Sequence, residues 1–545
     1  MSSCSPSCDR NEPARRSRAA TRRPASGVAA VALASLLALA MATLARAADG
    51  GQAWKVLEER WYRLTLAGSR CGWLHEKVER SGDSVRSSTW TQMTVGRMGQ
   101  GITLRTHTAF EETARGEPRR VEIRKESGAA PVTSTWTFGP AGIEIAEEQG
   151  GRRTTQVRPL PPGGWLTPRA ADEFVRRRLA ADAKEIAYVT IEPESGPDAV
   201  RVVSSRVGAR PAEVGGRTVT LTEWSTQTSL LERPTKDFFS ADGVLVRSVT
   251  DLGVGILESE LSDQADATAA VQPVEVMART FVRVGPAARA LTGSRRAELV
   301  VRARDGRLGD LPSAGAQAFS RLDAGSATVT VDASRDSAAA DAERNDQRFA
   351  RASVVADSDD PEVRALARRA TSGSGPSASG RAEALRSAVF RHISRKDLAS
   401  GFATASEAVR SRAGDCTEHA VLLCALLRAD GIPARVATGL LFVPDAGTVR
   451  DAYGWHMWTQ ALIDGRWVDL DAVLPAPGPR FDGSHLMTGA SAADGASLDA
   501  DLARIVDLMG DTVIEVRSID GRTVAPAAAP DATAPGTPGP GDRPR

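Results

Sequence analysis

The stretch that decides the fold is residues 412–431, RAGDCTEHAVLLCALLRADG, in which apolar residues recur with helical spacing. Asp415 is a good N-cap and Glu418 follows three residues later, so this spacing predicts a helix that begins at or next to Cys416. Gly431 is the expected left-handed residue at the end of that helix. The Cys416 sulfur is therefore predicted at a helix N-terminus, where unpaired backbone N–H groups and the helix dipole favour a thiolate over a thiol.

A second segment offers a base and a carboxylate. Residues 453–471, YGWHMWTQALIDGRWVDLD, contain two β-rich runs joined by Asp-Gly, which is typical of a two-residue hairpin. If Asp-Gly is the whole loop, the register places Asp471 diagonal to His456 on one face of the sheet, where their side chains can meet. Asp469 shares that face, but it lies four residues along from His456, roughly 13 Å at strand rise. We therefore expect Asp471, rather than Asp469, to contact His456.

This order of Cys, His and Asp, on a helix and two neighbouring strands, resembles the transglutaminase-like branch of the papain-like cysteine enzymes. The motifs that carry the resemblance are GDCTEHA at 414–420, GIPARVATG at 431–439, WHMW at 455–458 and WVDLD at 467–471. Two departures are small, because neither removes a reacting atom. The histidine motif reads His-Met-Trp rather than the commoner His-Ala-Trp, and Ala472 stands where a Pro often follows the Asp.

The resemblance implies an α+β fold, in which a helix-borne Cys packs on an antiparallel sheet. It also implies a catalytic triad in which Cys416 is the nucleophile, His456 is the base and then the acid, and Asp471 orients the imidazole. No cofactor and no metal is expected. The implied reaction is acyl transfer or hydrolysis on a protein or peptide amide through a Cys416 thioester, as in a transglutaminase-like acyltransferase or a cysteine protease. Water and an amine are both open as the acceptor.

Several other residues have a structural interpretation. Cys424 lies in an apolar run and is expected in the core, and His419 is expected to be a solvated or hydrogen-bonded helix residue. His485, in FDGSHL, is left undecided with a structural role favoured. A zinc site built from Cys416, His419 and His456 is geometrically conceivable, but no Cys-x-x-Cys or His-x-x-x-His pair supports it.

Composition sets broad limits on function. The chain has 545 residues, of which 41% are hydrophobic and 25% charged, as in ordinary globular proteins with several domains. Its formal net charge of +1 gives no indication of a nucleic-acid partner.

Residues 1–47 have the layout of a secretory signal peptide. An arginine-rich start is followed by an apolar run from Val28 to Leu44 and by Ala45-Arg46-Ala47, a small-x-small cleavage site. The sequence therefore predicts an exported protein, periplasmic or extracellular. The alternative is an uncleaved membrane anchor, because the apolar run is only slightly shorter than a roughly 20-residue span.

Residues 52–261 alternate polar and apolar side chains in short runs, which predicts an N-terminal, mainly antiparallel β-rich domain. A helical pattern at 170–183 interrupts these runs, and Cys71 is interpreted as a core residue or a free thiol. The region contains no motif of chemical meaning. We therefore interpret it as a binding or scaffolding domain, whose partner would be another component of the cell envelope.

The remaining divisions follow from changes in composition. They are a small β unit at 281–334, a linker at 335–356, a C-terminal extension at 491–521 and a disordered tail at 522–545. The resemblance implies that residues 357–490, between the linker and the extension, form the transglutaminase-like catalytic domain. The acidic run at 357–362 lacks the Gly and Glu of a calcium loop. It is explained by Asp360 as an N-cap with Pro361 at the first helical position.

The alternative function is a non-catalytic envelope scaffold with an inert papain-like core. It predicts that deleting residues 52–334 abolishes the effect of the protein, whereas Cys416→Ala does not.

Overall fold

The computed structural model describes residues 53–97, 100–127, 131–214, 216–231, 233–252, 255–275, 280–396, 403–446, 449–493 and 512–525. The chain divides into two compact units, residues 1–53 and 54–545, and the second contains every element discussed below. The predicted leader at 1–47 and residues 526–545 of the predicted tail lie outside the described residues. Within the described ranges, no helix combines the length and the apolar character needed to span a bilayer.

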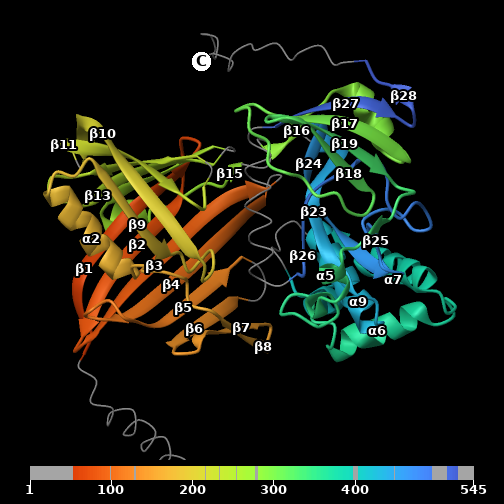
Figure 1. The fold of residues 1–545 in the computed structure, drawn as a ribbon, viewed down its shortest axis with the longest axis horizontal. Coiled ribbons are helices and arrows are strands. Elements are labelled where there is room, and N and C mark those ends of the chain that lie inside the picture. The colour runs from red at the N-terminus through yellow and green to blue at the C-terminus, as the bar shows by residue number, and fades with distance from the viewer. Residues whose placement is uncertain are drawn as a thin grey trace, which may run out of the picture. The chain divides into compact units, whose positions relative to one another are not determined.

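The N-terminal part is a 15-stranded sheet in which β15 alone runs parallel to its neighbour (Figure 1). The strands follow the order β8 to β1 and then β14 to β9. The antiparallel β-rich domain predicted at 52–261 is present, and the sheet continues beyond 261 because β15 pairs with β3. Helices α2 (Pro168–Ala180) and α3 (Gln264–Ala267) interrupt the strands. The strands are β1 (Lys55–Leu66), β2 (Ser69–Ser81), β3 (Ser84–Arg97), β4 (Gln100–Thr113), β5 (Pro118–Glu126), β6 (Val132–Gly139), β7 (Gly142–Gln149), β8 (Arg152–Arg158), β9 (Glu185–Ile191), β10 (Ala199–Val214), β11 (Arg217–Thr228), β12 (Thr235–Phe239), β13 (Leu245–Asp251), β14 (Ile256–Ser262) and β15 (Val274–Glu275).

The two faces of this sheet differ as the alternation of the strands requires. Side chains such as Phe110, Val121 and Trp136 form an apolar cluster on one face. On β1 to β4, a cross-strand row of half-buried rings stacks in sequence, with centroids 3.9 to 4.8 Å apart; the row is Trp61, His75, Trp90 and His107. Cys71 is a buried core residue outside any disulfide, and burial raises the pKa of its thiol to about 11.

A five-stranded sheet joins the small β unit to the C-terminal region. It has the order β18–β19–β17–β27–β28, in which β17 is Arg296–Ala303, β18 is Gln317–Asp323, β19 is Ser326–Asp332, β27 is Thr512–Ile519 and β28 is Arg522–Thr523. The prediction that disorder begins at residue 522 is therefore wrong for Arg522 and Thr523, which form β28. Asp520 and Gly521, both with positive φ, make a tight turn that returns the chain onto β27.

The interpretation of residues 335–356 as a linker is also wrong, because this segment packs on the core. It contains β20 (Ser337–Ala338), α5 (Asp341–Arg344) and the 3₁₀ helix η2 (Gln347–Phe349). β20 pairs with β25, and the Glu343 carboxylate accepts a hydrogen bond from the Trp467 indole at 3.1 Å. The polar, Ala-rich composition resembles a linker, but its larger apolar side chains, Phe349, Val354 and Val355, are buried.

The third part is an α+β core. Its six-stranded sheet has the order β20–β25–β24–β23–β26, with β16 (Val282–Arg283) also on β24. Helix α9 packs on strands β23 and β24, and helices α6, α7 and α8 pack on α9 (Figure 1). The remaining elements are η1 (Pro286–Leu291), α6 (Pro361–Thr371), α7 (Ala378–His392), β21 (Arg395–Lys396), α8 (Ala405–Ser411), β22 (Ala413–Gly414), α9 (Cys416–Ala429), β23 (Ala434–Ala446), β24 (Val449–Ile463), β25 (Arg466–Leu470) and β26 (His485–Ser491).

Helix α9 lies at the centre of this core. All its residues from Thr417 to Arg428 are buried, and Cys424 is one of the core side chains, as predicted. A helix that is buried all round is held by its neighbours, so the position of its first residue is set by the packing of the whole core. The predicted N-cap of α6 is confirmed, since Asp360 accepts hydrogen bonds from the backbone N–H groups of Glu362 and Val363.

Candidate active site

Cys416 is the first residue of α9, as the capping pattern predicts. The Asp415 carboxylate accepts a hydrogen bond from Thr417 N at 2.8 Å, and the Glu418 carboxylate accepts one from Asp415 N at 2.9 Å, which completes the capping box. Cys416 is partly exposed, whereas the residues from Ala413 to Asp415 and from Thr417 to Arg428 are buried. The thiol is therefore reachable at the positive end of a buried helix.

Gly414 makes room for the capping carboxylate. Its φ is +155°, and a Cβ at this position would lie 2.4 Å from Cβ of Glu418. Glu418 is fully buried, and burial, together with the charge of Asp415, raises the pKa of its carboxyl to about 7. The turn before Cys416 therefore depends on a residue without a side chain.

Gly414→Ala is expected to lower the free energy of unfolding by about 1–3 kcal/mol, the usual cost of overpacking, and to displace the start of α9. Urea denaturation and the labelling rate of Cys416 would measure both effects. Gly431→Ala is the matched control at the other end of the same helix, because φ is +82° there and no heavy atom lies within 4 Å of the added Cβ. A loss at Gly414 no greater than at Gly431 would contradict the steric explanation.

The hairpin of β24 and β25 has the predicted register. Ile463 pairs with Arg466, and the two loop residues Asp464 and Gly465 have φ values of 50° and 73°. Positive φ at both loop residues fits the type I′ turn, which Asp-Gly favours. The Thr459 hydroxyl on β24 donates a hydrogen bond to the Ala420 carbonyl at 2.9 Å, which ties this strand to the second turn of α9.

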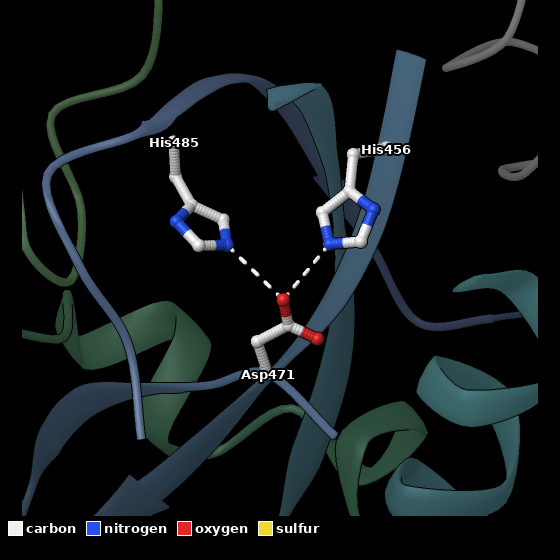
Figure 2. A group of neighbouring side chains, drawn as sticks. All are labelled: His456, Asp471 and His485. Carbon is white, nitrogen blue, oxygen red and sulfur yellow. Dashed lines mark hydrogen bonds and ion pairs between the residues drawn. The ribbon is translucent and has the colours of Figure 1, made fainter. Parts of the chain in front are cut away.

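His456 on β24 meets Asp471, as the register predicts, just after the end of β25. Nε2 of His456 lies 3.0 Å from Oδ2 of Asp471, and both side chains are buried (Figure 2). A carboxylate only accepts hydrogen bonds, so Nε2 carries the proton, and in the neutral ring Nδ1 has the lone pair. Asp469 instead accepts hydrogen bonds from Trp458 and Gln460, at 2.7 and 2.8 Å, and does not take this place.

A second imidazole completes the group. Nε2 of His485, at the start of β26, lies 3.2 Å from the same Oδ2 of Asp471 (Figure 2). Nδ1 of His485 lies 3.1 Å from the carbonyl oxygen and 3.2 Å from Oδ1 of Asp482. The sequence interpretation favoured a structural role for His485 and missed this contact. The signal was an aspartate three residues before a histidine in FDGSHL.

The charges of this group are set by their mutual contacts. Burial alone would raise the pKa of Asp471, but the imidazoles of His456 and then His485 hold it well below its usual range. Burial alone would lower the pKa of His485, whereas its bonds to Asp471 and Asp482 raise it to about 9. Against burial, His485 lowers the pKa of Asp482. At neutral pH the group therefore holds two carboxylates around a charged His485.

Arg386 on α7 holds the backbone that carries Asp471. Its fully buried guanidinium donates hydrogen bonds to the carbonyl oxygens of Asp471 and Leu474, at 3.1 and 3.0 Å. Glu383, one turn earlier on α7, pairs with it at 2.7 Å. Nothing in the helical pattern of this segment distinguishes Arg386 from the partly or fully exposed arginines of the same helix, Arg381 and Arg391, so sequence reasoning missed it.

His419 is the hydrogen-bonded helix residue that the sequence predicts. It is buried, Nδ1 donates to the Asp415 carbonyl at 2.6 Å, and burial lowers the pKa of the imidazole to about 4, so the ring is neutral. Over the described ranges, the zinc set of Cys416, His419 and His456 is not gathered as a group of ligands.

The ligand atoms that do cluster, within 4.8 Å of one another, belong to His456, Asp471 and His485. Both Nε2 atoms lie at hydrogen-bond distance from the same oxygen of Asp471, so a carboxylate oxygen occupies the point on which the two imidazoles converge. Two N–H donors that share one carboxylate acceptor account for these contacts.

Comparison with known proteins identifies a family for the part of the chain that holds Cys416, His456 and Asp471. Residues 364–472 match the model of the transglutaminase-like superfamily. Among solved structures, the chain is similar to the β-barrel-like protein of domain of unknown function DUF1849 from Brucella abortus, at 12% identity, with a TM-score of 0.29 and coverage of 38% of this chain and 95% of that one. It is also similar to a "Putative Cysteine Protease" from Cytophaga hutchinsonii, at 18% identity, with a TM-score of 0.26 and coverage of 43% and 89%. Among curated proteins, no sequence matches this chain.

Proposed function

Because the chain carries a transglutaminase-like domain at residues 364–472, we propose that it is a cysteine-dependent enzyme acting on protein or peptide amides. In this proposal Cys416 is the nucleophile, His456 is the base and then the acid, and Asp471 orients the imidazole. The observation that carries it is the hydrogen bond of His456 Nε2 to Asp471, which reserves Nδ1 for proton exchange. That imidazole lies on the strand that Thr459 ties to α9.

The proposed reaction has two halves. Nδ1 of His456 takes the thiol proton, and the Cys416 sulfur forms a bond with the carbonyl carbon of the substrate amide. The C–N bond then breaks as the imidazolium gives its proton to the leaving amine, which leaves a thioester on Cys416. Water or a second amine attacks the thioester, its proton passes to His456, and the proton returns to sulfur as the acyl product leaves.

The burial of the site supports this division of roles. Cys416 is partly exposed, so a substrate carbonyl can reach the sulfur, whereas His456, Asp471 and His485 are 4%, 1% and 1% exposed. Hydrogen bonds among charged groups are stronger in such a dry environment than in water. The buried Asp471 carboxylate can therefore stabilise an imidazolium while the substrate is bound outside it.

The first test measures the pH dependence of Cys416 alkylation by iodoacetamide in the mature full-length protein, followed by peptide mass. We expect a midpoint well below about 8.5, the value of a model thiol, and a return toward that value in His456→Ala. Cys71 and Cys424 are buried and provide internal controls, since neither should be labelled before unfolding. Labelling should disappear in Cys416→Ala.

A midpoint near 8.5 that His456→Ala does not change would contradict the enzymatic proposal. It would instead favour the inert-core scaffold, whose effect would depend on the N-terminal β-domain. The export predicted from residues 1–47 makes the cell envelope the place where we propose that substrates or such a partner are met.

A further inference from the structure

We propose that His485 is a positioning residue for proton transfer at His456, which fixes Asp471 through a second hydrogen bond and holds a positive charge beside the reacting imidazole. This inference rests on the proposed function, because it assigns a task within the same reaction. It adds a fourth side chain to the three that the sequence pattern predicts.

The charge of His485 follows from its contacts. Nε2 lies 3.2 Å from Oδ2 of Asp471, and Nδ1 lies 3.2 Å from Oδ1 and 3.1 Å from the carbonyl oxygen of Asp482. Carboxylate and carbonyl oxygens accept hydrogen bonds and donate none, so both ring nitrogens must carry a proton. An imidazole with two protonated nitrogens is an imidazolium, and the raised pKa of about 9 agrees with this.

The surroundings hold the ring of His485 in this orientation. It stacks on Phe481 with centroids 4.0 Å apart, and the Trp458 ring meets it edge-on at 5.3 Å. Asp482 is itself fixed, since it accepts hydrogen bonds from Ser484 N at 3.0 Å and from Gly293 N at 2.7 Å. The imidazolium therefore has little freedom to turn away from Asp471.

The effect on His456 comes from sharing one oxygen. The ring centroids of His456 and His485 are 5.6 Å apart, and both rings donate to Oδ2 of Asp471. The single charge of Asp471 is divided between them, and His485 repels a second imidazolium. In the proposed reaction this repulsion favours transfer of the proton from the His456 ring to the leaving amine.

The other titratable groups around the two rings do not add a second positive charge at the Asp471 carboxylate. Asp469, on β25, adds a buried carboxyl that interacts with His485. On the first turn of α9, the Glu418 carboxyl is turned away into hydrogen bonds with Asp415 N and Ala403 N, and buried His419 is neutral. His485 is therefore the positive charge, within the described part of the core, that contacts the carboxylate used by His456.

His485→Gln tests the charge while keeping an N–H donor for Asp471. We expect the upper midpoint of the pH–rate profile of Cys416 alkylation to rise by about 0.5 to 2 pH units, because the variant removes a positive charge beside the ring proposed to exchange the thiol proton. This is the shift that Coulomb's law gives for one charge at 5.6 Å, in a dielectric between that of water and that of a protein surface. His392→Gln is the matched control, because His392 ends α7 and bonds the Val409 carbonyl outside the site, and its profile should equal that of the wild type. An unchanged or lowered midpoint in folded His485→Gln would overturn the inference.

A second measurement does not depend on the stability of a His485 variant. In the full-length Cys416→Ala protein, which lacks the thiolate that could hold His456 charged, ¹³C-labelled histidine spectra should show one imidazole still protonated at pH 8. If all six histidines are neutral at that pH, His485 carries no charge and the proposal is wrong.

The proposed function and the role of His485 can be contradicted by different results. If the pH dependence of Cys416 alkylation in the wild type is that of a model thiol, the enzymatic function is contradicted. If the wild type has the lowered midpoint but His485→Gln leaves the profile unchanged, only the role of His485 is contradicted.

Discussion

Asp471→Asn is expected to reduce the free energy of unfolding by about 3–5 kcal/mol, the range for removing one partner of a buried ion pair. The same change should slow Cys416 alkylation at pH 6 by about 10²–10³-fold, because a thiol returned to a pKa of about 8.5 is largely protonated there. Asp471 accepts three N–H donors, from His456 and His485 at Oδ2 and from Val473 N at Oδ1. An amide has one acceptor oxygen, so in either orientation its NH₂ group faces a donor.

Asp469→Asn is the matched control for this prediction. Asp469 is also buried, two residues earlier, and it also accepts three donors, from Trp458, Gln460 and Ala316 N at 2.7, 2.8 and 2.7 Å. Urea denaturation should show a loss of stability in both variants, but only Asp471→Asn should change the labelling of Cys416. Equal effects of the two substitutions on labelling would mean that Asp471 acts through folding alone.

The second large effect is expected in the pH dependence of stability. The pKa of His485 is about 9 in the folded protein and about 6.5 for an ordinary histidine, so folding binds a proton between these values. Its contribution to stability is fully present below pH 6.5 and is lost as the pH rises through 9. The difference corresponds to about 3 kcal/mol. We therefore expect the advantage of the wild type over His485→Gln to shrink by about that amount between pH 6.5 and pH 10.

Denaturation of both proteins in urea at several pH values in this window would measure the change. The pKa of the Glu418 carboxyl is raised from its usual 4.5 to about 7, so its effect on stability changes with pH near the lower end of this window. The effect is the same in both proteins and cancels in the comparison. The lowered pKa values of Asp471 and Asp482 contribute stability that is lost only as the pH falls into the acid range, outside this window. A difference between the proteins that stays constant from pH 6.5 to pH 10 would show that His485 is not charged in the native state.

The sequence determines the parts of the site that depend on residues close together in the chain. Asp415 and Glu418 specify the start of α9 through local hydrogen bonds, so the position of Cys416 at a helix N-terminus was predictable. The Asp-Gly loop leaves a single register for β24 and β25, and that register alone separates Asp471 from Asp469. The α+β fold of the core follows from the same local patterns together with the family resemblance.

The tertiary structure alone decided which distant groups meet these residues. His485 and Asp482 come from a strand and loop beyond the hairpin, and Arg386 comes from a helix far before it. His485 and Arg386 form hydrogen bonds with Asp471, and Asp482 holds His485. β27, near the C-terminal end of the described chain, likewise pairs with β17, which lies near the middle of the sequence. Such contacts arise from packing and from the burial of charges, which have no sequence period. The motif therefore indicates which side chains can react, whereas the packed fold sets their protonation.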